Sequence, residues 1–134
     1  MLRRPGQHTG TGGDGYVFHV VPCPAPRMTR ADAWKDRPCV LRYRAYRDQV
    51  RLEAQRLDFM LPAVLHITFV LPMPASWSTK KRQKMKGTPH QQKPDRDNLL
   101  KAFQDSFEGD DGFVWAGRTT KVWGEEGKII VDVS

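Results

Sequence analysis

PDRDNLLKAFQDSF, residues 94–107, is the most clearly patterned stretch of the chain. Its apolar residues Leu99, Phe103 and Phe107 recur every four positions, with charged and polar residues between them. This spacing places the three side chains on one face of an α-helix. We therefore predict an amphipathic helix over roughly residues 95–107, which needs another element to cover its apolar face.

Two strands and a second helix are predicted upstream of this helix. Residues 16–21 and 63–71 are rich in β-branched and aromatic residues and are followed by prolines, which is typical of strands that end there. Residues 41–57 lie between them and indicate an amphipathic helix. The positions that recur near helical spacing in this segment are Tyr43, Tyr46, Val50 and Leu57.

Two further strands are predicted downstream, over residues 113–123 and 128–133. Residues 124–127, the link between them, are bracketed by glycines, which is typical of a hairpin. We expect Trp115 and Trp123 to pack within this hairpin. The resulting order, β-α-β-α-β-β, indicates an α+β fold with one mixed sheet and two main helices.

The domain organisation follows from length and composition. A chain of 134 residues fits a single domain with one modest core. Residues 1–15 are rich in glycine and polar residues, so we predict a flexible N-terminal tail followed by a folded domain over residues 16–134. Residues 76–93 form a basic insert in this domain, predicted to be an irregular or partly ordered loop.

The charge balance points to a polyanionic partner. The chain has 22 Lys and Arg residues against 15 Asp and Glu residues, a net charge of +7. No apolar run approaches the roughly 20 residues needed to cross a bilayer, and the basic N-terminus lacks the apolar segment of a secretory signal. We therefore expect no membrane role and a cytoplasmic location. Cys23 and Cys39 lie in no metal-binding spacing and are expected to be free thiols.

Basic residues concentrate in two predicted loops, residues 27–38 and 76–93. Such loops can be solvated surface, or they can contact the phosphate backbone of a nucleic acid. The candidate DNA contacts are Arg27, Arg30, Lys35, Lys80, Lys81, Arg82, Lys84, Lys86, Lys93 and Arg96.

The acidic residues are placed differently from the basic ones. Asp95 lies in the extended segment before the predicted helix and Asp97 in its first turn, so both carboxylates can converge on one point. The electropositive helix N-terminus favours ionised carboxylates there. Mg²⁺ takes hard oxygen ligands, usually one or two from the protein. Asp111, with Asp110 beside it, can add a third acid from a separate turn.

Lys101 lies four residues after Asp97, where its ammonium can stabilise charge that develops on a phosphate. Each of these features has a simpler explanation: Asp95 or Asp97 can be a helix cap, Asp97 and Lys101 an ordinary surface pair, and Asp110-Asp111 turn residues. Their coincidence in a very basic chain nevertheless favours a cation site within a phosphate-binding surface.

Residues 95–102, DRDNLLKA, are similar to the D-x-D-N-L-x-K-A signature of the RusA family of Holliday junction resolvases, which phages and prophages often carry. Asp110-Asp111 followed by Val114 and Lys121 resembles the D-D-x-x-V motif at the start of a strand in that family. Weaker similarities are the proline-rich turn at residues 22–26 and the Tyr-Arg-Asp run at residues 46–48.

The resemblance implies a RusA-like nuclease domain over residues 16–134. It implies that Asp95, Asp97 and Asp111 bind Mg²⁺, for which Mn²⁺ can substitute, and that Lys101 assists catalysis. The family's third ligand falls on Asp111, with Asp110 as the alternative because the connection from Asp97 is shorter here.

A homodimer is also implied, and its twofold symmetry would match the two opposed cuts that a four-way junction needs. The expected activity is paired phosphodiester hydrolysis in DNA recombination and repair, in the cytoplasm of a bacterium or of a phage host. The alternatives are a non-catalytic nucleic-acid-binding protein and a metal-dependent nuclease that acts on RNA or single strands.

Overall fold

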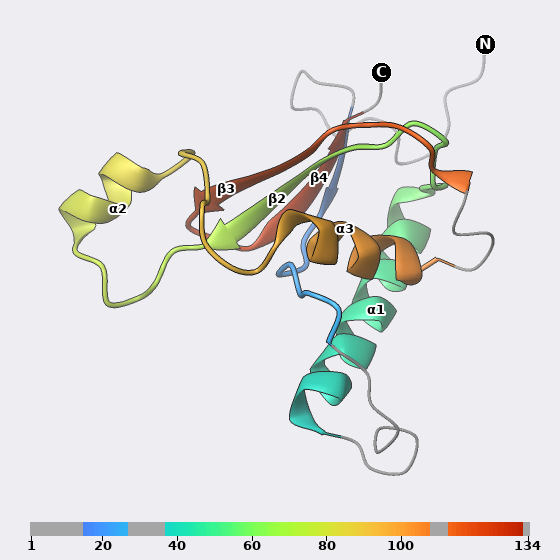
Figure 1. The fold of residues 1–134 in the computed structure, drawn as a ribbon, viewed down its shortest axis with the longest axis horizontal. Helices are drawn as coiled ribbons and strands as arrows, with labels where there is room; N and C mark the ends of the chain where they lie inside the picture. Colours follow the sequence, from blue (N-terminus) through green and yellow to red (C-terminus); the bar gives the residue numbers. More distant parts are fainter. Residues whose placement is uncertain (1–14, 27–36, 108–112, 133–134) are drawn as a thin grey trace.

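The computed structural model describes residues 15–26, 37–107 and 113–132. Within these ranges the chain forms four strands and three helices in the order β1, α1, β2, α2, α3, β3, β4 (Figure 1). The predicted α+β fold on one mixed sheet is confirmed, with one short helix more than expected. The predicted tail lies outside the described residues, apart from Gly15, which begins β1.

The sheet is formed by β1 (Gly15–Phe18), β2 (His66–Pro72), β3 (Thr119–Gly124) and β4 (Lys128–Asp132). Their spatial order is β1-β4-β2-β3. Strand β4 is antiparallel to both of its neighbours, β1 and β2, whereas β3 is parallel to β2. Strand β3 is therefore an edge strand, and the candidate site lies beside it.

The predicted hairpin between the last two strands is wrong, because β2 lies between β3 and β4 in the sheet. Two strands separated by a third are about 10 Å apart. Three extended residues can span that distance, so the link at residues 125–127 fits either arrangement. Trp123 is buried as expected, but Trp115 is 76% exposed and does not pack in a hairpin.

Regular pairing in the predicted strand over residues 113–123 begins only at Thr119. Before it, Ala116 forms an isolated bridge with Val64. Gly117 has a φ of +138°, and a Cβ at this position would overlap the Leu65 carbonyl. Only glycine allows the two segments to approach this closely, so the irregular lead-in to β3 is built into the sequence.

One face of the sheet is covered by α1 (Pro38–Leu57) and α3 (Arg96–Asp105) (Figure 1). Helix α1 begins three residues before the predicted start, because Pro38 suits the first turn of a helix. Helix α3 buries Leu99 and Phe103 as predicted, and contacts β3. None of the helices in the described ranges is long and apolar enough to cross a membrane.

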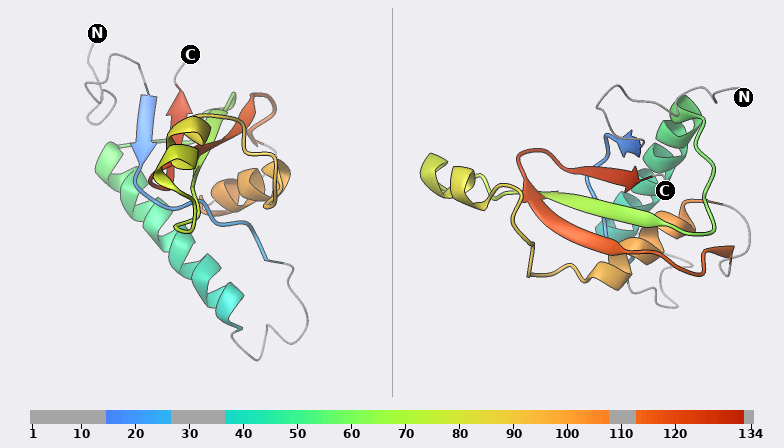
Figure 2. Two further views of the ribbon diagram at one scale, coloured as in Figure 1. Left: turned by 90° about the vertical axis from the view of Figure 1, so that its left-hand side faces the viewer. Right: turned by 90° about the horizontal axis from the view of Figure 1, so that it is seen from above.

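The basic insert is not an irregular loop throughout, because residues 79–85 form α2 (Thr79–Met85). The Ser78 side chain caps this helix by accepting a hydrogen bond from the Lys81 amide at 3.2 Å. Helix α2 buries none of its residues and projects away from the end of the sheet (Figures 1 and 2). It lacks the apolar periodicity by which a helix is recognised in a sequence.

Candidate active site

Asp95 and Asp97 lie at the N-terminus of α3, as predicted. Asp95 occupies the N-cap position with extended backbone angles, and its carbonyl oxygen accepts a hydrogen bond from the Leu99 amide at 3.1 Å. Its carboxylate does not cap the helix, and Asp97 follows in the first turn. Both side chains are exposed, and neither carboxylate has a hydrogen-bond or ion-pair partner among the described residues. The two carboxylates are therefore available to a ligand.

A surface hollow of about 390 Å³ lies at this point, lined by Asp95, Arg96, Asp97 and Asn98. It offers hard oxygen donors with access to water, the combination that Mg²⁺ prefers when a protein supplies one or two carboxylates. The described residues contain no cluster of three metal-ligating side chains. Asp110 and Asp111, the predicted source of a third carboxylate, lie outside the described residues.

Lys101 forms an ion pair with Asp105, which follows it in α3, and not with Asp97, which precedes it. Its Nζ lies 3.1 Å from Asp105 Oδ2, one turn further along α3. The Tyr43 hydroxyl on α1 donates to the same oxygen at 3.0 Å. Burial, followed by this hydrogen bond to Asp105, raises the pKa of Tyr43 well above its usual value. The Lys101 side chain is 65% exposed, so its ion pair is weak and can be exchanged for a phosphate.

Two side chains attach the start of α3 to the edge strand β3. Lys121 Nζ donates to the carbonyl oxygens of Gln92 at 2.6 Å and Pro94 at 2.7 Å. Arg96 Nη1 donates in the other direction, to the Thr119 carbonyl oxygen at 3.4 Å. No separate role for Lys121 follows from the sequence, because a single lysine in a strand looks like a surface residue. The signal that could have revealed it is its place in the alternation of β3.

The segment between α2 and α3 lies along the same edge strand. The His90 amide donates to the Lys121 carbonyl oxygen at 3.0 Å, and Pro89 forms a bridge with Val122. The His90 ring is buried and packs on Trp123 at a centroid distance of 4.2 Å. Burial, followed by the nearby charge of Lys121, lowers the pKa of His90. These contacts make β3 a rigid support for the residues that lead into the site.

The predicted DNA contacts of the insert divide into two groups. Arg82 is engaged with the protein itself, since its Nη1 donates to the Pro74 carbonyl oxygen at 2.9 Å. Lys81 lies over the Trp77 ring at 4.2 Å, and Lys86 approaches Glu125 at 3.9 Å. The exposed residues of the set with no partner among the described residues are Lys80, Lys84 and Lys93.

Three of the predicted DNA contacts, Arg27, Arg30 and Lys35, lie outside the described residues. Those on α2 are separated from the start of α3 by the segment that runs along β3, so the structure does not gather all candidates into one patch (Figure 1). Arg96 is the one predicted DNA contact in the described ranges that lines the hollow with Asp95 and Asp97.

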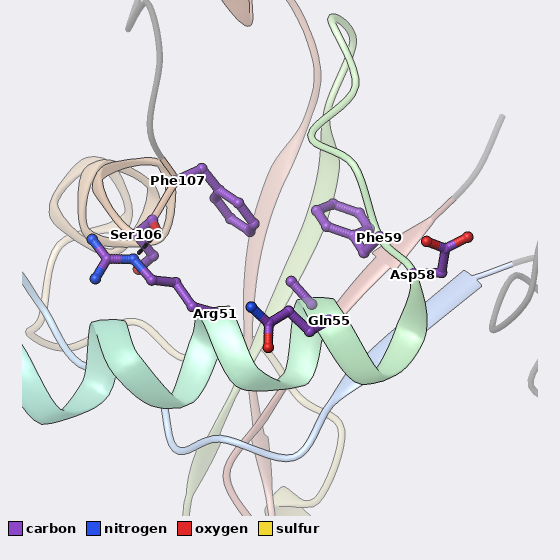
Figure 3. Close-up of a pocket in the computed structure, with 7 residues that line it drawn as sticks. Arg51, Gln55, Asp58, Phe59, Ser106 and Phe107 are labelled. Atoms are coloured by element: carbon purple, nitrogen blue, oxygen red, sulfur yellow. Dashed lines mark hydrogen bonds between the residues drawn. The ribbon is translucent and has the colours of Figure 1, made fainter.

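A larger hollow of about 530 Å³ lies at the opposite end of α3 (Figure 3). Its lining comes from α1, the two residues after it and the two residues after α3. Within it, Arg51 Nε donates to the Ser106 carbonyl oxygen at 2.8 Å. Phe59 and Phe107 form its apolar part. It contains none of the predicted site residues and therefore does not contribute to the site at Asp95 and Asp97.

Comparison with protein families identifies a match over most of the chain. The model of the family described as endodeoxyribonuclease RusA matches residues 18–134. This range includes both carboxylates at the start of α3, Lys101, and the acids at positions 110 and 111. No curated protein and no solved structure matches the chain significantly.

Proposed function

Because the chain belongs to the RusA family of Holliday junction endodeoxyribonucleases, we propose that it cuts branched DNA at the start of α3, with Asp95 and Asp97 as ligands of Mg²⁺. Membership of the family makes it a phosphodiester hydrolase of DNA recombination and repair. The two alternatives, a binding protein without activity and a nuclease of RNA or single strands, are thereby set aside.

The observation that carries the assignment of the site is the pair of unpartnered carboxylates at a helix N-terminus. Two like charges held close together repel each other, and a bound cation relieves this repulsion. In a chain with an excess of basic residues, both acids have nevertheless been left without a partner among the described residues. We assign the third ligand to Asp111, with Asp110 as the alternative, and expect Mn²⁺ to substitute for Mg²⁺.

The bound ion would lower the pKa of a water molecule and stabilise the leaving oxygen. The chain's own residues orient the substrate. The N-terminal amides of α3 attract a phosphate through the positive end of the helix dipole. Arg96 lines the hollow, and Lys101 can leave Asp105 to stabilise the negative charge that develops on the phosphate.

Binding and symmetry complete the proposal. Residues 16–134 form the nuclease domain, in which the insert at residues 76–93 supplies Lys80 and Lys84 to the DNA backbone. Arg27, Arg30 and Lys35 add further phosphate contacts. A homodimer would present two sites symmetrically to the two strands to be cut. We expect the enzyme to act in the cytoplasm of a bacterium or phage host.

Purified protein can be tested with a labelled four-way junction, a linear duplex of the same sequence and a single strand. Each is incubated with Mg²⁺, with Mn²⁺ or with a chelator. We expect symmetric cuts in the junction alone, and only with a metal ion. Equal cutting of the single strand, or junction cutting that survives the chelator, would contradict the proposed function.

A further inference from the structure

We propose that Lys121 on β3 is a positioning residue for the metal site, because its ammonium fixes the peptide group that precedes Asp95. This inference rests on the proposed function, in which Asp95 and Asp97 hold the ion. In this proposal Lys121 binds neither the metal ion nor the DNA. It acts instead through the backbone of residues 92–95.

The contacts of Lys121 are specific to this backbone. Its Nζ donates to the carbonyl oxygens of Gln92 and Pro94, at 2.6 Å and 2.7 Å. Hydrogen bonds from a charged donor are stronger than those between neutral groups. The Pro94 carbonyl belongs to the peptide group that joins Pro94 to Asp95, so its orientation is coupled to the φ angle of Asp95. The side chain of Asp95 is attached at the Cα atom about which this angle turns, so the direction of its carboxylate depends on it.

The position of Lys121 in the sheet shows that its charge is placed for this contact. Lys121 stands opposite Phe69, which is fully buried in the core. Side chains alternate between the faces of a sheet, so Lys121 and the buried Trp123 share the core-facing side of β3. An ammonium on this side is costly unless it is hydrogen-bonded. The two carbonyl groups meet this need, and they lie directly before the metal site.

Lys121 is itself held rigidly enough to serve as a reference point. Its strand pairs with β2 along its whole length, and its carbonyl oxygen accepts from the His90 amide at 3.0 Å. The contact from Arg96 to the Thr119 carbonyl attaches the first residue of α3 to the same strand. Asp95 therefore lies between two attachments to β3, one on each side in the sequence.

The test compares Lys121→Met and Lys121→Gln with the wild type. Methionine has nearly the length of lysine but no hydrogen-bond donor. Glutamine has a donor, but its side chain is too short to reach the Pro94 carbonyl oxygen. Lys128→Met is the matched control, since Lys128 is a half-buried lysine on β4 that has no hydrogen bond to residues 92–95. Magnesium affinity is measured by calorimetry without DNA, and single-turnover cleavage and junction affinity are measured beside it.

Residues that orient a metal ligand typically change metal affinity or activity by about 10- to 100-fold when removed. We expect a loss of that size in magnesium affinity and cleavage rate for both Lys121 variants, with junction affinity unchanged, and none for Lys128→Met. Lys121→Gln keeps the test valid if the methionine variant does not fold.

A folded Lys121 variant that binds Mg²⁺ as tightly as the wild type would overturn the inference. Normal magnesium affinity with weaker, less salt-dependent junction binding would instead make Lys121 a phosphate contact, and would also overturn it. Failure of the wild type to bind Mg²⁺ or to cut junctions would refute the proposed function before any variant is compared.

Discussion

At the level of single residues, Lys101 has two aspartates within reach on its own helix, Asp97 one turn before it and Asp105 one turn after it. Helix electrostatics favours an acid that precedes its lysine, and thus Asp97. The structure pairs Lys101 with Asp105 instead, because the Tyr43 hydroxyl from α1 also holds that carboxylate. A contact between helices has therefore overridden the local preference and left Asp97 free.

Lys101→Ala is expected to lower single-turnover junction cleavage by about a hundredfold, the usual effect of removing one group that stabilises transition-state charge. Junction affinity should change much less, because most of it comes from other basic residues. Asp105→Asn is the control: it removes the partner of Lys101 in the described structure and should leave cleavage intact. A large loss of affinity with a normal cleavage rate would show that Lys101 is only a phosphate contact.

At the level of elements, the sequence predicted the helices whose buried residues recur at helical spacing. Leu99 and Phe103 reveal α3 because both pack against the core, and the acids before them reveal where it starts. Helix α2 buries nothing, so the same criterion missed it. The pairing of β3 with β2 could not be predicted either, because the link to β4 is long enough for β3 to lie beside β4 or beyond β2. Only the packing of the whole sheet selects the second arrangement.

The residues of the site also divide into those that the sequence predicted and those that it did not. Asp95 and Asp97 could be predicted because they lie two residues apart at the start of a strongly patterned helix, in a chain with 22 basic against 15 acidic residues. The contacts of Lys121 were not predicted, although its place in the alternation of β3 is a signal, because its partners are backbone carbonyl groups, which have no sequence signature of their own.

Helix α2 gives a prediction about binding. Replacing Lys80 and Lys84 with glutamine should weaken binding to a junction and to a linear duplex by similar factors, because lysines meet phosphates as point charges. The slope of log affinity against log salt should flatten by about 0.9 for each phosphate that is no longer neutralised. Arg56→Gln, which removes one positive charge in the last turn of α1, is the control for a loss of charge elsewhere on the surface. Loss of junction binding alone would show that α2 recognises the shape of the junction.

At the level of the whole molecule, most large apolar side chains of the described residues are buried in a single core under one face of the sheet. Some remain outside, including Phe113 and Trp115, which are 53% and 76% exposed. Both lie in the irregular segment before β3 and increase the apolar surface that a second subunit could cover.

We therefore expect sedimentation at micromolar concentration to give a particle of twice the 15.4 kDa subunit mass. Paired incisions need two symmetric sites, so the dimer should persist on the junction. A 15.4 kDa species that remains monomeric when junction DNA is added would refute the paired-site arrangement and favour a nuclease that nicks one strand.

The central claim is that the carboxylates at the start of α3 hold the catalytic metal, and Asp97→Asn tests it most directly. The matched control is Asp58→Asn, an exposed aspartate with a left-handed backbone that asparagine also adopts readily. We predict that Asp97→Asn folds, binds the junction as tightly as the wild type and cuts it more than about a hundredfold more slowly in Mg²⁺, because the ion has lost a ligand. Near wild-type cleavage by Asp97→Asn would contradict the claim.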